Sequence, residues 1–251
     1  MAIGYKIAHV IRDKFPWLWD LTERFNSILF SIRYGETVSR FRFSAIPDGY
    51  KIMRMEDVST EDIVNFFAKQ PAEAFTFFKP HGFDYKSIQS LQKNKAFLAF
   101  FLIDCTQDDA ERPCDDKQPI IAGYFFIRSF FHGKGFRGRM VDIDYRNKGL
   151  GTAMNKLLNE IGFSIGLRLY ETISMDNIAS YRSAIKASNI KIINEDFEKR
   201  EYFFEILNEP MNHNINSAMD TERRSQFREG KQVNRIILSL YSSGYKERRA
   251  A

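Results

Sequence analysis

Apolar and polar residues between positions 47 and 207 alternate with two different periods, and each period predicts a type of element. Short apolar runs rich in Phe and Ile predict strands, whereas apolar residues in steps of three and four predict helices. The predicted strands span residues 50–55, 96–103, 120–131, 139–145, 167–174, 190–194 and 202–207. The predicted helices span residues 60–67, 152–162 and 178–187, and residues 75–92 are expected to be irregular and helical in part. Strands interleaved with helices in this order indicate an α/β or α+β fold, in which helices cover the faces of one sheet.

Two extensions flank this central region of residues 47–207. Residues 1–46 carry apolar side chains at helical spacing, which predicts amphipathic helices with breaks at residues 15–16 and 34–35. The extension is basic, so residues 1–33 fit peripheral contact with a membrane surface. Packing on the main domain, or on a second subunit in a homodimer, fits the same pattern. Residues 208–251 form a basic C-terminal extension with a short predicted helix over residues 233–241.

Composition narrows the class of protein. The chain has 251 residues, 44% of them apolar, which is enough for a large core to which 24 Phe contribute. Two cysteines are too few for a disulfide framework or a four-cysteine zinc site. Neither a secretory signal nor an apolar run of about 20 residues is visible, so we expect a cytoplasmic protein. The net charge of +5 suits an anionic ligand, but basic and acidic residues are interleaved, which argues against nucleic acid as a partner.

One segment, residues 145–153, follows a strand-like run and opens a predicted helix. Gly149 and Gly151 allow the backbone to turn tightly and to approach a ligand without an intervening Cβ. The unpaired N–H groups and the positive dipole end of the next helix favour an anion, and Arg146 and Lys148 add positive charge. The segment therefore predicts a cradle for a phosphate or diphosphate group. It lacks the Gly-Lys-Ser/Thr ending of a P-loop and the third glycine of a dinucleotide-binding fingerprint.

This segment resembles the GCN5-related N-acetyltransferase (GNAT) family. Residues 146–151 match the Q/R-x-x-G-x-G/A motif of that family. Asn177, followed at the third position by Ser180, is similar to the second signature of the family, an Asn-x-x-Ser/Ala helix after the fifth strand. The resemblance covers residues 50–207. It implies a mixed, mostly antiparallel sheet in which two central parallel strands, 139–145 and 167–174, splay apart and receive acetyl-CoA.

The resemblance also implies which residues hold acetyl-CoA as the co-substrate, with no metal. Backbone N–H groups of the loop would bind the diphosphate, backbone groups of the preceding strand would pair with the pantetheine arm, and the second signature would line the arm and its thiol end. The residues of the loop are Arg146, Asn147, Lys148, Gly149, Leu150, Gly151 and Thr152. Those of the preceding strand are Met140, Val141 and Ile143, and those of the second signature are Asn177 and Ser180.

The residues that serve many family members as acid and base are not in place here. The family's tyrosine, seven residues after the asparagine, corresponds to Ala184, and Tyr181 lies nearly one helical turn earlier. Members that acetylate protein N-termini often have a glutamate as base five residues before the asparagine, and this position is Thr172 here. Glu171 lies next to it, but a step of one residue along a strand turns the side chain to the opposite face.

Other candidates for proton transfer precede the loop. Asp142 and Asp144 alternate with apolar residues in the predicted strand 139–145, so they share one face and are placed to orient or deprotonate an amine. A solvated strand face or an ion pair fits the same pattern. His81 and His132 lie beside glycines in predicted loops and are interpreted as surface residues. The catalytic candidates are thus Asp142, Glu171 and Tyr181, with water as an alternative proton relay.

The resemblance implies an acetyl-CoA-dependent N-acetyltransferase, and we expect it to act on a primary amine of a small molecule. The basic segment from His132 to Arg139 favours a phosphorylated acceptor, such as a nucleotide-linked amino sugar. Two alternatives stay open: a protein or peptide N-acetyltransferase that uses Glu171 or water, and a non-catalytic acyl-CoA-binding module. The missing acid and base positions favour the binding module slightly.

Overall fold

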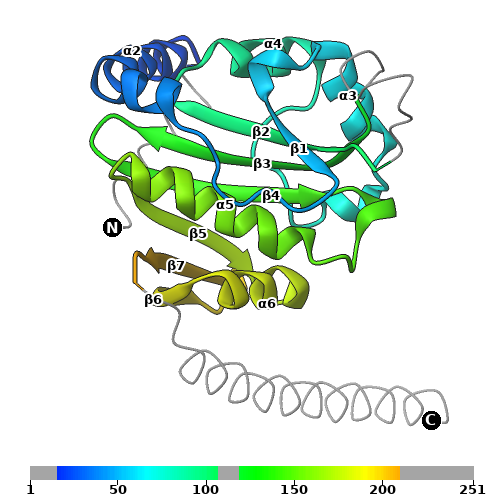
Figure 1. The fold of residues 1–251 in the computed structure, drawn as a ribbon. Helices are drawn as coiled ribbons and strands as arrows, with labels where there is room; N and C mark the ends of the chain where they lie inside the picture. Colours follow the sequence, from blue (N-terminus) through cyan, green and yellow to red (C-terminus); the bar gives the residue numbers. More distant parts are fainter. Residues whose placement is uncertain (1–15, 107–118, 210–251) are drawn as a thin grey trace, which may run out of the picture. The chain divides into compact units, whose positions relative to one another are not determined.

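The computed structural model describes residues 16–106 and 119–209 and contains one mixed sheet (Figure 1). Seven strands form this sheet in the order β1-β2-β3-β4-β5-β7-β6. They are β1 (Tyr50–Arg54), β2 (Phe97–Asp104), β3 (Ile121–Phe130), β4 (Lys134–Val141), β5 (Arg168–Ser174), β6 (Asn189–Asp196) and β7 (Glu201–Leu207). All neighbouring strands are antiparallel except β4 and β5, which are parallel. The predicted mixed, mostly antiparallel α/β sheet is therefore confirmed.

Helices cover both faces of the sheet. The α-helices of the described chain are α2 (Pro16–Arg40), α3 (Thr60–Lys69), α4 (Tyr85–Lys93), α5 (Leu150–Ser164) and α6 (Ile178–Ala187). Met140 of β4 belongs to the same apolar cluster as residues of α3 and α4. The next residue, Val141, lies beside Gly151 at the start of α5. Because consecutive residues of a strand point to opposite faces, α3 and α4 lie on one face and α5 on the other, with α6 packed beside α5.

Local signals in the sequence explain where α3 and α4 begin. The Ser59 hydroxyl accepts a hydrogen bond from the backbone N–H of Asp62 at 3.0 Å, and the Asp84 carboxylate accepts one from Ser87 at 3.0 Å. Such caps satisfy amides that have no partner within the helix. β2 is buried along its whole length, as its unbroken apolar run predicts for a central strand.

The first helix is continuous where the sequence predicted a break. α2 runs from Pro16 to Arg40 and passes through the Tyr34–Gly35 pair, so the predicted break at residues 34–35 is wrong. A glycine within a helix costs only about 1 kcal/mol. The buried side chains of Phe30, Tyr34 and Val38 lie one turn apart on the inner face of the helix, and their packing offsets that cost.

α2 contacts the end of β3 through polar groups. The Asn26 side chain donates to the Ser129 carbonyl at 2.9 Å and accepts from the Phe131 amide at 3.0 Å. Glu23 forms an ion pair with Arg128 at 2.8 Å. The helix is therefore attached to the sheet at several points. The predicted break at residues 15–16 and the predicted helix at 233–241 fall wholly or partly outside the described residues.

The strand that leads to the glycine-containing loop is shifted relative to the prediction. β4 spans Lys134–Val141 rather than residues 139–145, so most of the basic segment from His132 to Arg139 is strand. A tight turn around Gly133, whose φ is 91°, precedes it. Gly135 and Gly138 lie within β4, and both positions require glycine because there is no room for a side chain. A Cβ would lie 2.6 Å from Ile127 Cγ2 at Gly135 and 2.6 Å from Phe126 Cζ at Gly138.

β4 ends because a side chain caps the next turn. The Asp142 carboxylate accepts the Asp144 amide at 2.9 Å and begins a short 3-10 turn, η3 (Ile143–Tyr145). The alternation that placed Asp142 and Asp144 on one strand face does not apply to this turn.

Candidate functional site

β4 and β5 are paired only at their beginnings. Within the described chain their ladder joins Lys134, Gly135 and Phe136 to Arg168, Leu169 and Tyr170, and it then stops. β4 stays paired with β3 as far as Val141, and β5 stays paired with β7 as far as Ser174. The two strands therefore diverge in the middle of the sheet (Figure 1). The backbone groups that face this opening have no strand partner across it.

An exposed loop follows β4 at the wide end of this opening. It leads from η3 to α5, and Gly149 is the N-cap of α5. Asn147 and Gly149 have φ angles of 63° and 79°, so the chain turns sharply at both residues. Among the described residues, none accepts a hydrogen bond from the backbone amides of residues 147–151. Open amides at a helix N-terminus favour an anion, as the sequence predicts for this segment.

The base of the loop is anchored to the neighbouring part of the sheet. The Tyr145 hydroxyl donates to the Asp104 carboxylate at 2.6 Å, and Asp104 is the last residue of β2. Burial, together with this hydrogen bond, raises the pKa of Tyr145. The Lys148 ammonium lies 4.5 Å from the centre of the Tyr145 ring. A cation of the loop is thereby held beside the open amides.

The two positions of the motif, Gly149 and Gly151, require glycine for different structural reasons. A Cβ added at Gly149 would meet no heavy atom within 4 Å, so it is the positive φ that requires glycine there. A Cβ at Gly151 would lie 3.3 Å from Ser183 Oγ and 3.7 Å from Val141 Cγ2. Gly151 therefore allows α5 to pack closely on α6 and β4, whereas Gly149 faces open space.

Asp142 is buried and already fully engaged. Its carboxylate accepts hydrogen bonds from the Gln70 amide at 2.7 Å, from the Lys69 ammonium at 3.4 Å and from the Asp144 backbone. Asp144 is exposed and pairs with Lys69 at 2.8 Å. This hydrogen bond, which outweighs the opposing effect of burial, raises the pKa of Lys69. The arrangement ties the turn before the loop to the end of α3, which favours a positioning role for Asp142 over proton transfer.

Glu171 lies inside the sheet between two arginines. Its carboxylate accepts from Arg137 Nε at 2.7 Å and from Arg139 Nη1 at 2.6 Å. Burial by itself raises the pKa of Glu171, but the two guanidinium groups outweigh burial and hold it below its usual value. A carboxylate so engaged is a poor proton acceptor for a substrate.

The second signature lies at the start of α6. The Asn177 side chain caps this helix by accepting the Ser180 amide at 3.1 Å. Ser180 in turn accepts hydrogen bonds from Arg139 through its carbonyl at 3.0 Å and its hydroxyl at 3.1 Å. The Tyr181 ring is buried and packs against Tyr202 and Phe204 of β7. The structure therefore connects Ser180 and Glu171 through Arg139, whereas Asp142 contacts α3 on the other face of the sheet.

The three residues predicted to pair with a pantetheine arm differ in environment. Met140 and Val141 are the last residues of β4, beside the opening. Ile143 lies in η3, and its amide donates to the Gln70 side chain at 3.2 Å. Its N–H is therefore engaged within the protein.

His81, which the sequence places at the surface, is partly buried in the structure. Its Nε2 lies 2.9 Å from the Tyr124 hydroxyl, and its Nδ1 lies 2.8 Å from the Gly82 carbonyl. A carbonyl only accepts, so Nδ1 carries the proton and Nε2 accepts from Tyr124. Burial lowers the pKa of His81 to about 4. The density of Phe residues on both sides of position 81 was the available signal, because such a segment packs into the core.

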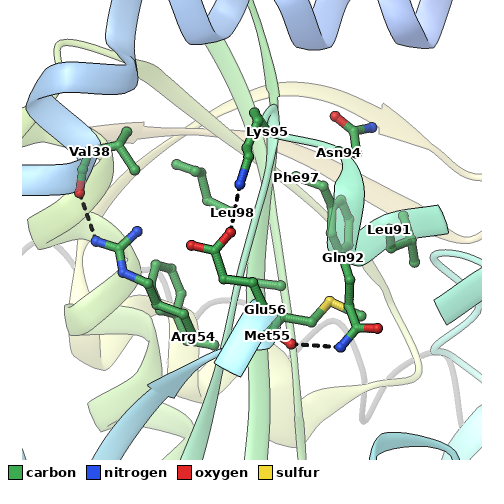
Figure 2. Close-up of a pocket in the computed structure, with 12 residues that line it drawn as sticks. Val38, Arg54, Met55, Glu56, Leu91, Gln92, Asn94, Lys95, Phe97 and Leu98 are labelled. Atoms are coloured by element: carbon green, nitrogen blue, oxygen red, sulfur yellow. Dashed lines mark hydrogen bonds and ion pairs between the residues drawn. The ribbon is translucent and has the colours of Figure 1, made fainter. Parts of the chain in front are cut away.

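A separate pocket lies away from the splayed strands, between α2, β1, α4 and β2 (Figure 2). Arg54 and Glu56 line it, together with Lys95, which pairs with Glu56 at 2.7 Å. None of the residues predicted to bind a cofactor or to act in catalysis lines this pocket. In the part of the chain that the structure describes, no group of three or more His, Cys, Asp or Glu is arranged to hold a metal ion. No helix there has both the length and the apolar character needed to cross a membrane.

Comparison with known proteins gives a match in structure but not in sequence. No family model and no curated protein matches the sequence. The ribosomal-protein-S5-alanine acetyltransferase from Vibrio fischeri superposes with a TM-score of 0.51 at 13% identity, over 68% of this chain and 100% of that one. An acetyltransferase of the GNAT family from Bacillus anthracis gives a TM-score of 0.47 at 17% identity, over 64% and 95% of the two chains. The N-acetyltransferase PseH from Campylobacter jejuni, in complex with acetyl coenzyme A, gives a TM-score of 0.43 at 13% identity, over 64% of this chain and 99% of that one. At these identities the likeness concerns the fold.

Proposed function

We propose that this chain, which has the fold of the GCN5-related N-acetyltransferases, transfers an acetyl group from acetyl-CoA to a primary amine of a small molecule. One observation carries the proposal: the parallel strands β4 and β5 separate after three residue pairs, and a loop with open amides stands at the wide end of the opening. A thioester on a long arm attached to a diphosphate is the kind of ligand that such a combination accommodates.

The residues of the site fit coenzyme A. The backbone amides of residues 147–151 are free to bind its diphosphate, and the exposed side chains of Arg146 and Lys148 add positive charge. Thr152 lies in the first turn of α5. The unpaired edge of β4 at Met140 and Val141 supports strand-like pairing with the amides of the pantetheine arm. Bound acetyl-CoA would supply the activated acetyl group.

Proton transfer is assigned to water in this proposal. Asp142 and Glu171 are buried and hydrogen-bonded to cationic and amide partners, so neither is free to accept a proton from a substrate amine. The Tyr181 ring is buried among aromatic residues of β7. An acceptor amine that reaches the opening as the free base needs only a solvent path for the proton that it loses.

The acceptor in this proposal is a small primary amine, without a required phosphate group. In the sequence, the basic segment from His132 to Arg139 favours a phosphorylated amino sugar. Arg137 and Arg139 are buried in contact with Glu171, so they are not available to a phosphate at the surface of that segment. Lys134 is exposed and His132 lies in the adjacent exposed turn. A phosphorylated acceptor is therefore one member of the panel to be tested.

Titration calorimetry with acetyl-CoA tests the co-substrate, and release of the CoA thiol in the presence of amines tests the reaction. The panel contains a polyamine, an aminoglycoside, a free and a nucleotide-linked amino sugar, and a peptide with a free N-terminus. Thiol release that depends on one small amine supports the proposal. Release with the peptide alone would favour protein N-acetylation. Binding without release for any amine would favour a non-catalytic acyl-CoA-binding module, and absence of binding would refute the proposal.

A further inference from the structure

Two arginines and one glutamate join β4 to β5 at the point where the backbone pairing ends. Arg137 directly follows the last paired residue of β4, and Glu171 directly follows the last paired residue of β5. Arg139 lies two residues further along the same face of β4 and binds the second oxygen of the Glu171 carboxylate. The side chains of Arg137, Arg139 and Glu171 are 0%, 6% and 4% exposed. We call these three residues the splay triad.

The splay triad carries one more positive charge than negative charge. The other groups that bind it are neutral: Asn159 and Ser188 for Arg137, and Ser180 for Arg139. Glu171 and Arg139 are charged groups that act on Arg137, and among the described residues Nη2 of Arg137 has no hydrogen-bond partner. An excess charge held away from water is costly, so this site is complementary to an anion.

The position of Arg139 shows from which side an anion would approach. Its Nε lies 3.9 Å from the place that a Cβ on Gly151 would occupy, in the first turn of α5. Arg139 thus lies between the loop with open amides, residues 147–151, and the narrow end of the opening, where the pairing of β4 with β5 stops at Phe136 and Tyr170. We call this loop the open-amide loop. In the proposed function the diphosphate would bind the amides of residues 147–151. The part of coenzyme A that would extend from there along β4 toward Arg139 is its arm, which ends in the sulfur.

Resting on the proposed function, we propose that the splay triad provides the positive charge that stabilises the thiolate of coenzyme A, with Arg139 nearest to the sulfur. When an amine attacks the thioester carbonyl carbon, a C–N bond forms and the C–S bond breaks. The electron pair of the C–S bond goes to sulfur, and the proton of the amine goes to water. Two guanidinium groups fixed by Glu171 need no reorganisation to receive this charge, and solvent protonates the thiolate when the product leaves.

Stabilisation of the thiolate changes the pH dependence of coenzyme A binding, which is measured without turnover. Titration calorimetry with the full chain would compare coenzyme A with acetyl-CoA from about pH 6 to about pH 9, a range that brackets the ordinary pKa of a thiol, about 8.5. If the thiolate is stabilised, affinity for coenzyme A rises with pH by up to about tenfold per pH unit between the pKa of the bound thiol and that of the free thiol. Affinity for acetyl-CoA, whose sulfur does not ionise, lacks this additional rise.

Each outcome has one meaning. Identical pH dependence for the two ligands would refute the role of the splay triad and leave the proposed function intact. Absence of binding for both ligands at every pH would refute the proposed function itself. A rise confined to coenzyme A supports the inference, and the variants then show whether the splay triad is its source.

The decisive variant is Arg139→Gln, because it leaves Arg137 and Glu171 as a neutral pair. We expect it to abolish the additional rise with pH while acetyl-CoA still binds, whereas Arg139→Lys retains the rise. Arg182→Gln removes an exposed arginine of α6 and is the matched control for charge, with the rise unchanged. An unchanged rise in Arg139→Gln, or an equal loss of affinity for both ligands, would refute the assignment to sulfur. If Arg139→Gln fails to fold, the pH dependence of the two ligands on the unaltered chain still tests the proposal, because identical dependence refutes it.

Discussion

Two glycines with nearly the same φ angle, Gly149 and Gly166, provide a controlled test of the loop at residues 147–151. Gly149 has a φ of 79° and Gly166 a φ of 78°, and a Cβ at either would meet no heavy atom within 4 Å. An alanine at either site is therefore strained by the same amount, about 1–2 kcal/mol. For a folded region of this size, we expect both Gly149→Ala and Gly166→Ala to lower the melting temperature by about 2 to 8 °C.

Binding separates the two variants because only Gly149 lies in the loop. If the strain is relieved by a rotation that turns even one loop amide away from the diphosphate, a hydrogen bond to a charged group is lost, which costs about 1.5–3 kcal/mol. Affinity for acetyl-CoA in Gly149→Ala should then fall about 10- to 150-fold. Gly166→Ala should bind as the unaltered chain does. Calorimetry at a temperature well below both melting points measures the difference. Equal affinities for the two variants would show that the loop does not bind the co-substrate.

Three further predictions concern residues outside the loop. Asp142→Asn should lower the free energy of unfolding by about 1–3 kcal/mol, because a buried acceptor becomes a donor; with the folded fraction matched, turnover should fall less than about tenfold, whereas loss of a general base costs about 100-fold or more. His81 binds its proton more weakly in the folded chain, where burial lowers its pKa from 6.5 to about 4. The unfolded chain therefore takes up the extra proton, and stability should decrease by up to about 3 kcal/mol as the pH falls from about 6.5 to about 4. Denaturant titrations should show that His81→Gln removes this component, and a pH dependence that is unchanged in the variant would contradict it. Asn26→Ala should cost about 1–3 kcal/mol, because it leaves the Ser129 carbonyl and the Phe131 amide without their partner, while affinity for acetyl-CoA stays unchanged. A melting temperature equal to that of the unaltered chain would mean that α2 does not stabilise the sheet.

The parts of the fold that the sequence predicts are those in which one local pattern decides. The apolar run of β2 is too short for a helix and too apolar for an exposed strand, and the strand is buried along its whole length. Ser59 predicts the start of α3, and its hydroxyl caps the helix by accepting the Asp62 amide. The Gly149 motif predicts an open turn before a helix, and the loop has that form. In each case the interaction lies within a few residues of the signal.

The candidate acid and base depended instead on contacts between distant elements. The pattern placed Asp142 on a strand face, but its own side chain ends the strand, and its partner Gln70 comes from α3. Glu171 and Arg137 are separated by 34 residues, and no spacing rule brings them together. The break predicted at Gly35 failed for the same reason, because the packing of α2 on the sheet overrides a local preference.

The narrow end of the opening explains why Glu171 is placed between arginines rather than free to act as a base. Two strands that separate within a sheet lose their ladder, and side chains must then fix where the separation begins. On one face, Phe136, Tyr170 and Phe203 stack across β4, β5 and β7, with ring centres 5.6–6.2 Å apart. On the other face, Glu171 binds both arginines of β4. Protonation of Glu171 during each turnover would remove its charge from two buried guanidinium groups, which is costly. A carboxylate that fixes the strands is therefore unsuited to carry the proton of the proposed reaction, and the excess positive charge beside it suits the anionic leaving group that we propose.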